Sequence, residues 1–180
     1  MHLAAVSAPG RLAGPRPAIS IRLPRREDGA RVWELVAESG GLDANSLYCN
    51  LLQCSHFAET CAIAEAGGDI IGWVSGYIPP GAPDTYFVWQ VCTAESARGQ
   101  GLARRLIASV LARPCCAGVT RLQSTITAAN TASWALFGGV AAALGAPMTH
   151  APHFTREAHF AGRHDTEHLV SIGPFARRAA

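Results

Sequence analysis

The residues with the most evident chemistry form a glycine-rich turn, Arg98-Gly99-Gln100-Gly101-Leu102-Ala103, between an apolar run and an amphipathic segment. Glycine lets the backbone approach a ligand closely, and the first amides of a helix have no partner within that helix. Those amides and the helix dipole attract anions such as a pyrophosphate. The guanidinium groups of Arg98, Arg104 and Arg105 add charge-assisted hydrogen bonds to phosphate. The turn therefore predicts an anion site, and a plain tight turn is the alternative.

A dinucleotide-binding fingerprint is another interpretation of these glycines, and the sequence argues against it. Counted from Gly99, the sixth position holds Arg104 instead of glycine. No Asp or Glu follows about 20 residues further on to bind a ribose. Lysine chemistry is excluded as well, because all 15 residues counted as Lys or Arg are arginine. Schiff-base enzymes, PLP enzymes and Walker-A ATPases therefore drop out.

Strand and helix patterns alternate around the turn. Apolar alternation and turn residues predict strands at 19–22, 61–65, 70–77, 86–92, 121–127 and 168–172. Helical periodicity predicts helices over 27–38, after a cap at Asn45 or Ser46, from 102 towards Pro114, and from a cap at Asn130 to Leu144. This order predicts an α/β domain in which helices flank a mixed central sheet.

Two of these elements carry expectations about burial. The second helix has Leu47, Leu51 and Leu52 along one side, which predicts its buried face. The strand at 86–92 is an almost unbroken apolar run, which is typical of a central strand buried on both faces.

Length and composition favour one globular domain. The chain has 180 residues, of which 49% are hydrophobic and 16% charged. We expect a disordered lead-in over 1–17, a single domain over 18–175 and a frayed tail over 176–180. No signal-peptide core or membrane-length apolar segment is visible, which predicts a cytoplasmic protein with no membrane partner. The net charge of +2 gives no indication of nucleic-acid binding.

The cysteines and histidines form no metal-binding pattern. The six cysteines lack C-x-x-C spacing, which favours free thiols in a reducing compartment. Five histidines crowd the last third of the chain without paired cysteines or an H-E-x-x-H motif. We therefore expect no metal and interpret these histidines as solvated loop residues, a metal-binding interaction domain being the alternative. They are His150, His153, His159, His164 and His168.

The six residues of the turn match R/Q-x-x-G-x-G/A, and residues 130–137, Asn-Thr-Ala-Ser-Trp-Ala-Leu-Phe, match N-x-x-A/S-x-x-L-Y in all but the last position. These are motifs of the Gcn5-related N-acetyltransferases (GNAT), which the chain therefore resembles. The resemblance implies acetyl-CoA as co-substrate and a strand, here 85–93, that splays from its neighbour and holds the acetyl carbonyl through its backbone. The cofactor-binding residues that it implies are Val91, Cys92, Thr93, Arg98, Gly99, Gln100, Gly101, Leu102, Ala103, Arg104, Asn130, Ser133 and Phe137.

Phe137 departs from the family pattern, which places at this position a tyrosine that acts as a general acid. A phenyl ring has no proton to give to a leaving thiolate. We therefore expect the proton to come from water or from the attacking nitrogen. A catalytically idle acyl-CoA-binding module is the alternative that this departure favours.

Further segments, at 42–48, 61–65, 74–80, 83–91 and 172–175, together with these motifs are similar to the L-2,4-diaminobutyrate N-acetyltransferases of ectoine biosynthesis. This resemblance extends from Ile19 to Phe175. It implies transfer of acetyl to the 4-amino group of L-2,4-diaminobutyrate, and a homodimer. The nearest alternative is a GNAT enzyme that acts on another small diamine or amino acid, such as ornithine.

Such an acceptor needs an anion for its ammonium group and donors for its carboxylate. Asp43 before the second helix is the best-placed acid, and helix-start amides near Asn45 and Ser46, or an arginine, suit the carboxylate. Tyr48 is a further hydrogen-bond donor. Trp89 on the acetyl-holding strand offers a ring face to a cation. In the alternative, Asp43 is only a helix-start acid and Trp89 a core residue. The full set of candidates for substrate binding is Asp43, Asn45, Ser46, Tyr48, Trp89, Gln90, His164 and Glu167.

We expect direct attack by the neutral amine in a ternary complex, with Asp43, Trp89 and Val91 as the catalytic residues. An alkyl amine with a pKa of ~10.4 must lose a proton first, and Asp43, Glu167 or a water held by Gln90 are open as acceptors. The backbone N–H of Val91 or Cys92 would bind the oxyanion. A covalent intermediate on Cys92 is not expected, because no histidine lies close to it in the sequence.

Overall fold

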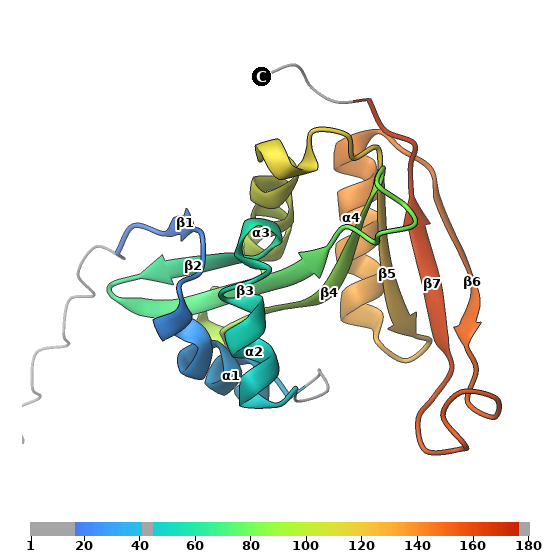
Figure 1. Ribbon diagram of the computed structural model, residues 1–180, viewed down its shortest axis with the longest axis horizontal. Coiled ribbons are helices and arrows are strands. Elements are labelled where there is room, and N and C mark those ends of the chain that lie inside the picture. The colour runs from blue at the N-terminus through green and yellow to red at the C-terminus, as the bar shows by residue number, and fades with distance from the viewer. Residues whose placement is uncertain (1–16, 41–44, 177–180) are drawn as a thin grey trace, which may run out of the picture.

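The computed structural model describes residues 17–40 and 45–176, in which one seven-stranded sheet carries four α-helices (Figure 1). The strands are β1 (Ser20–Arg22), β2 (Ala62–Ala66), β3 (Asp69–Tyr77), β4 (Thr85–Thr93), β5 (Arg121–Thr127), β6 (Met148–Phe154) and β7 (Glu167–Ile172). The helices are α1 (Gly29–Glu38), α2 (Leu47–Gln53), α3 (Leu102–Leu111) and α4 (Thr131–Leu144).

The spatial order of the strands is β1-β2-β3-β4-β5-β7-β6, and only β4 and β5 pair in parallel among these neighbours. The predicted mixed sheet flanked by helices is thus confirmed. The expected lead-in and tail fall, apart from Pro17 and Ala176, outside the described residues. No helix in the described part of the chain has the length and apolar character of a membrane span.

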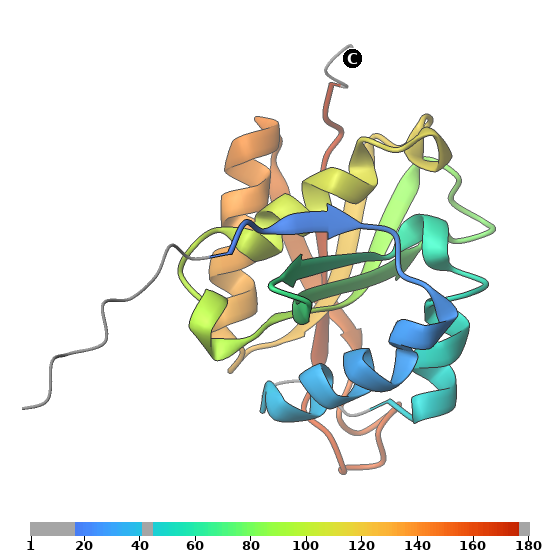
Figure 2. The same cartoon turned by 90° about the vertical axis from the view of Figure 1, so that its left-hand side faces the viewer.

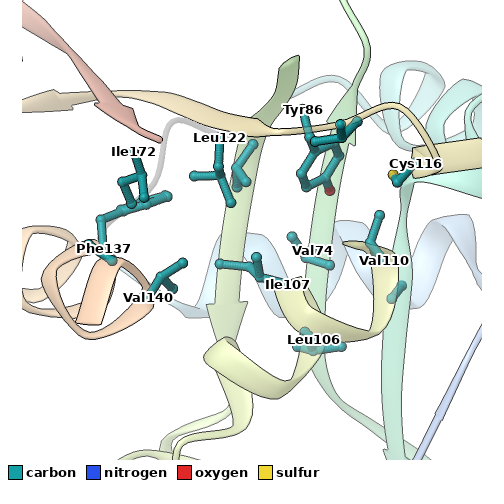
Figure 3. Packing of buried hydrophobic residues seen from close by; sticks show 14 of the residues in the cluster. Val74, Tyr86, Leu106, Ile107, Val110, Cys116, Leu122, Phe137, Val140 and Ile172 are labelled. Carbon is teal, nitrogen blue, oxygen red and sulfur yellow. The ribbon is translucent and has the colours of Figure 1, made fainter. Parts of the chain in front are cut away.

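The two faces of the sheet pack against different helices. Successive residues of a strand point to opposite faces, and β2 shows this directly. Ala62 and Ala64 pack in the cluster that contains Leu106 of α3 and residues of α4, whereas Ile63 packs in a second cluster with Val32 of α1. Figure 3 shows the first cluster, in which α3 and α4 cover one face of the sheet.

The sheet opens between β4 and β5. The two strands pair only where Thr85–Phe87 face Arg121–Gln123, and they diverge beyond that point (Figure 1). The predicted splay of the strand at 85–93 therefore exists. It leaves the later backbone groups of β4, on the side away from β3, without a neighbouring strand.

A β-bulge at Trp89 reverses the faces of β4. Ser75 of β3 pairs with Gln90 and Gly76 pairs with Val88, so Trp89 has no partner on β3. Val88 and Cys92 are four residues apart and would share a face in a regular strand, yet they pack in opposite clusters. Trp89 is 45% exposed. The expectation that this strand is buried on both faces is confirmed for Val88 and Cys92, which pack in clusters on opposite faces, and is wrong at Trp89, where the bulge and the splay open one side.

The predicted buried side of α2 is also wrong. Leu47 and Leu51 are exposed, whereas Asn50 and Gln53 are buried. The two buried amides lie one helical turn apart, and Asn50 Nδ2 donates to Gln53 Oε1 at 3.0 Å. This single bond lowers the cost of burying the two side chains, although Asn50 Oδ1 and Gln53 Nε2 are buried without a hydrogen-bond partner among the described residues.

The strand β6 lies in a segment where the sequence predicts no element. It is an edge strand, almost all of its residues are exposed, and it contains Pro152. Exposure on both faces removes the alternation from which strands are predicted. The loop interpretation of the late histidines is wrong at His150 and His153, which lie on β6, and at His168, which lies on β7.

A salt-bridge network attaches the start of α1 to the sheet. Arg22 of β1 donates to both carboxylate oxygens of Asp28, at 2.7 and 2.9 Å, and to Glu65 Oε2 of β2 at 2.8 Å. These hydrogen bonds from Arg22 are the main cause that holds the pKa of Asp28 below its ordinary value, against the opposing effect of burial. Figure 2 views the molecule from this edge, with α1 below β1.

Candidate active site

A groove of about 650 Å³ opens between the carboxyl end of β4, the start of α3 and α4. Gly99 and Gly101 adopt φ angles of +73° and +69°, a left-handed conformation that other residues adopt only at a cost. Gly101 is the N-cap of α3, so the turn directs the first amides of this helix outward. The local sequence therefore builds an anion site at the mouth of the groove.

Most of the predicted cofactor residues line this groove. Gln100 does not, since its side chain donates to the carbonyl of Ser96 at 3.0 Å. Arg105 also lies outside the lining, whereas Arg98 lines the groove and donates to the carbonyl of Ser39 at 3.3 Å. The predicted residues found in the lining are Val91, Cys92, Thr93, Arg98, Gly99, Gly101, Leu102, Ala103, Arg104, Asn130 and Ser133.

A second cavity, of about 280 Å³, lies in the opening between β4 and β5, and we call it the acceptor cavity. Trp89 and Gln90 line it from β4, and Asn45 lines it from the segment before α2. Asn45 Nδ2 donates to Gln90 Oε1 at 2.9 Å, and Trp33 Nε1 of α1 donates to the Asn45 carbonyl at 3.0 Å. The first two helices thereby position a polar wall of this cavity.

An imidazole and a carboxylate from the end of the chain complete the acceptor cavity. His164 Nε2 lies 3.9 Å from Glu167 Oε1, and His164 Nδ1 lies 2.8 Å from the carbonyl oxygen of Asp165. Glu167 is mostly buried and is the only carboxylate among the described residues that line the cavity. Among the described residues, Glu167 is therefore the carboxylate that a cationic amine placed in this cavity would meet.

The groove and the acceptor cavity meet at three described residues, Val91, Asn130 and Ser133. Asn130 is the N-cap of α4, and its Oδ1 accepts a hydrogen bond from the Ser133 amide at 3.0 Å. Val91 brings the open backbone of β4 to the same place. A ligand held in the groove and a second one in the cavity would therefore react here, which is the geometry of group transfer between two substrates.

Comparison with known proteins agrees with this arrangement. The model of the acetyltransferase (GNAT) family matches residues 29–138. The L-2,4-diaminobutyric acid acetyltransferase of Methylotuvimicrobium alcaliphilum is 50% identical over 159 residues, which cover 88% of this chain and 92% of that protein. The chain belongs to the GNAT acetyltransferase family.

Further relatives extend the likeness to a solved structure. The L-2,4-diaminobutyric acid acetyltransferase of Halomonas elongata is 47% identical over 156 residues, covering 86% of this chain and 81% of its own length. The diaminobutyrate acetyltransferase of Paenibacillus lautus, solved with L-2,4-diaminobutyric acid and coenzyme A, superposes with a TM-score of 0.85. That pair is 39% identical, over 91% of this chain and 99% of the other. The GNAT fold predicted from the sequence is thus confirmed.

Two of the predicted substrate residues of this GNAT protein, Ser46 and Tyr48, do not line the acceptor cavity, and a third lies outside the described residues. Ser46 caps α2, where its hydroxyl accepts from the Cys49 amide at 3.2 Å. Tyr48 is 69% exposed on the outer side of α2. Asp43 lies outside the described residues, so the structure assigns it no position. Phe137, predicted beside the cofactor, is buried and lines the acceptor cavity instead of the groove.

The sequence prediction missed the part of the acceptor cavity that β5 supplies. Residues 124–127 of β5 line it. In the GNAT pattern β4 diverges from the strand beside it, so that neighbouring strand is exposed along the opening. The strand predicted at 121–127 could therefore have been identified as a wall of the cavity. On α4 the missed groove residues are Ala132, Ala135, Leu136 and Gly139. These four residues are spaced as i, i+3, i+4 and i+7, so they share one face of α4, and this spacing could have identified them. Elsewhere in the groove, Ser39 and Ala97 had no comparable signal.

Cys92 lies beside the reacting position but is a poor nucleophile. Burial raises the pKa of its thiol to about 12. At neutral pH the reactive thiolate is therefore scarce. The site favours direct transfer between two bound substrates over an acetylated cysteine.

Proposed function

We propose that this protein transfers the acetyl group of acetyl-CoA to the 4-amino group of L-2,4-diaminobutyrate, as a step of ectoine biosynthesis. The observation that carries the proposal is a carboxylate-bearing cavity that opens directly onto the GNAT cofactor groove. Its polar wall and single described carboxylate, Glu167, suit a small amino acid that carries two amines. The relatives with the same printed activity support this acceptor.

In the proposed mechanism Glu167 takes a proton from the incoming ammonium, directly or through a water. The neutral nitrogen then attacks the thioester carbon, and the carbonyl oxygen becomes an oxyanion. The backbone amide of Val91 lies on the side of β4 that β5 leaves open, and it donates to that oxyanion. The Cys92 amide points towards β3, because successive amides of a strand alternate in direction and the Ala94 amide donates to the Ile71 carbonyl of β3. Collapse of the intermediate breaks the C–S bond, and the proton that the attacking nitrogen loses passes, directly or through water, to the sulfur, which leaves the amide and CoA thiol. No covalent enzyme intermediate forms.

The remaining groups of the acceptor need partners of their own. We assign Trp89 to the cavity wall, where its exposed ring suits an ammonium group, and Asn45 and Gln90 to polar contacts with the acceptor. His164 lies close enough to Glu167 to orient its carboxylate. Asp43, although outside the described residues, stays in the proposal as a second anion for the α-ammonium.

We also propose a homodimer. Leu47, Tyr48 and Leu51 form an exposed apolar side of α2, with Trp33 of α1 exposed as well. Exposed apolar groups of this size favour contact with another protein surface. Light scattering on the purified protein tests the dimer, and a monomer at micromolar concentration would contradict it. The proposed setting is the cytoplasm, a compartment that suits six cysteines without disulfides.

The test of the proposed function is release of CoA thiol from acetyl-CoA in the presence of L-2,4-diaminobutyrate, ornithine or lysine. NMR of the product identifies the acetylated nitrogen. Selective turnover at N4 of diaminobutyrate is the expected result. Turnover on ornithine alone would agree with GNAT chemistry but would contradict diaminobutyrate as the acceptor. Binding of acetyl-CoA with no turnover on any amine would indicate an idle binding module.

A further inference from the structure

The proposed function requires the thioester to lie where the groove and the acceptor cavity meet, and the present inference rests on that function. The CoA sulfur must then lie near Val91, Asn130 and Ser133, the described residues common to both cavities. A thiolate develops there when the C–S bond breaks. The phenolic donor of the family pattern is absent, because Phe137 lines the acceptor cavity with a phenyl ring.

Of these three residues, only Ser133 carries a hydroxyl group. Val91 has an apolar side chain, and the Asn130 carboxamide is held as the cap of α4 by its bond to the Ser133 amide. Within the described structure the Ser133 hydroxyl makes no hydrogen bond, unlike Ser124 nearby, whose hydroxyl donates to the Val88 carbonyl at 3.0 Å. The Ser133 hydroxyl is therefore available to a ligand at the junction.

We infer that Ser133 is a catalytic residue that donates a hydrogen bond to the CoA sulfur as the C–S bond breaks. The nitrogen lone pair forms the C–N bond, and the electron pair of the C–S bond moves to sulfur. The hydroxyl stabilises this thiolate until it receives the proton that the nitrogen has lost. The serine itself gains and loses no net proton, so the overall products are the amide and CoA thiol.

The position of Ser133 in α4 adds to this stabilisation. Ser133 is in the first turn of a helix of 14 residues, and the positive end of the helix dipole points towards the junction. A developing negative charge is favoured at such an end. The hydroxyl supplies the directed bond, and the helix supplies a favourable field.

The experiment compares Ser133→Ala, Ser133→Thr and Thr131→Ala in the full-length protein. Thr131 is exposed in the same helical turn and lines neither cavity, so its variant is the matched control. A hydrogen bond to a charged group predicts that Ser133→Ala lowers kcat about 10- to 100-fold, with the KM of acetyl-CoA changed less than about twofold. Ser133→Thr keeps a hydroxyl and should recover most of kcat. Adding Phe137→Tyr to Ser133→Ala should restore part of the lost rate.

The outcomes separate this inference from the proposed function. If the wild-type protein acetylates no amine, the proposed function fails. If the wild-type protein is active and Ser133→Ala retains its kcat, the inference alone is overturned. Equal losses in Ser133→Ala and Ser133→Thr, or a loss confined to acetyl-CoA affinity by calorimetry, would also overturn it, because a hydroxyl bond to sulfur predicts neither.

Discussion

The cofactor groove and the acceptor cavity are built in different ways. The groove is lined mainly by two continuous stretches, 91–104 and 130–139, and its turn contributes backbone amides and glycines. The acceptor cavity draws on five separate segments, near Asn45, on β4, on β5, at the start of α4 and at His164 and Glu167. The cofactor groove is thus formed by residues that are close together in the sequence, whereas the acceptor cavity is formed by side chains that only the tertiary fold brings together.

This contrast implies that substitutions should separate the two substrates kinetically. Changes in the groove should act on the KM of acetyl-CoA, and changes in the acceptor cavity should act on the rate with the amine. Val91, Asn130 and Ser133 belong to both and should affect both steps. The four predictions that follow run from the largest expected effect to the smallest.

Glu167→Gln should cause the largest loss. The amide keeps the shape of the side chain but neither attracts the ammonium nor accepts its proton. We expect kcat/KM for diaminobutyrate to fall by about 100-fold or more, with unchanged affinity for acetyl-CoA. Initial rates and calorimetry measure the two quantities. Glu157→Gln is the matched control, since Glu157 is exposed in the β6–β7 connection and lines neither cavity. An equal loss of acetyl-CoA affinity in Glu167→Gln would contradict the expectation that the acceptor cavity and the groove act on different substrates.

Asp28→Asn tests the support of the acceptor side, because Asp28 holds the start of α1 to the sheet. The folded-state pKa of Asp28 lies below its unfolded value of ~3.9, so its contribution to stability is full above that value and is lost as the pH falls through the folded pKa. We expect the free energy of unfolding to fall by about 2 kcal/mol at pH 7. The difference from the wild-type protein should shrink as the pH falls below about 4, because the unfolded wild-type chain then binds a proton at Asp28 that the folded protein, with its lower pKa, takes up only at lower pH.

Urea unfolding at pH 7 and below pH 4 measures this effect. Asp69→Asn is the control, because Asp69 is highly exposed and lies 3.7 Å from Arg31 in a surface ion pair. Its removal should change the unfolding free energy by less than about 1 kcal/mol. A difference for Asp28→Asn that stayed constant with pH would show that the Arg22 bonds are not its cause.

Arg98→Gln should have a smaller effect, confined to the groove. Loss of one charge-assisted bond to phosphate predicts a rise of about tenfold in the KM of acetyl-CoA, with little change in kcat. Arg105→Gln is the control, since Arg105 is exposed outside the groove lining and should leave that KM within about twofold. If both variants raise the KM of acetyl-CoA equally, the two arginines contribute only a general positive potential and no specific bond to phosphate.

The same contrast explains what the sequence could predict. The turn at 98–103 and the cap at Asn130 were predictable, because each depends on neighbours within a few residues, whereas the splay of the strand at 85–93 was implied only by the family resemblance. The exposure of Trp89 was not, since it follows from one unpaired residue in the register of β3 and β4. The meeting of His164 and Glu167 with β4 depends on β7 and on its neighbour β6, the edge strand whose exposure removes the apolar pattern.

Cys92→Ala should have the smallest effect on turnover, although the residue lines the groove beside the reacting atoms. Burial holds the pKa of this thiol at about 12, so an acetylated cysteine would have to form from a very small thiolate fraction. We therefore expect kcat within about twofold of the wild-type value and intersecting lines in double-reciprocal plots, as a ternary complex requires.

The matched control is Cys54→Ala, a buried thiol of the same α1-side cluster that lines neither cavity. Both substitutions remove one sulfur from the core, so both should lower the unfolding free energy by about 1 kcal/mol. Parallel double-reciprocal lines together with an inactive Cys92→Ala would contradict direct transfer. The Cys92 sulfur would then accept the acetyl group from acetyl-CoA and pass it to the amine. A change at Cys92 would in that case affect both half-reactions, and the two regions would not act separately.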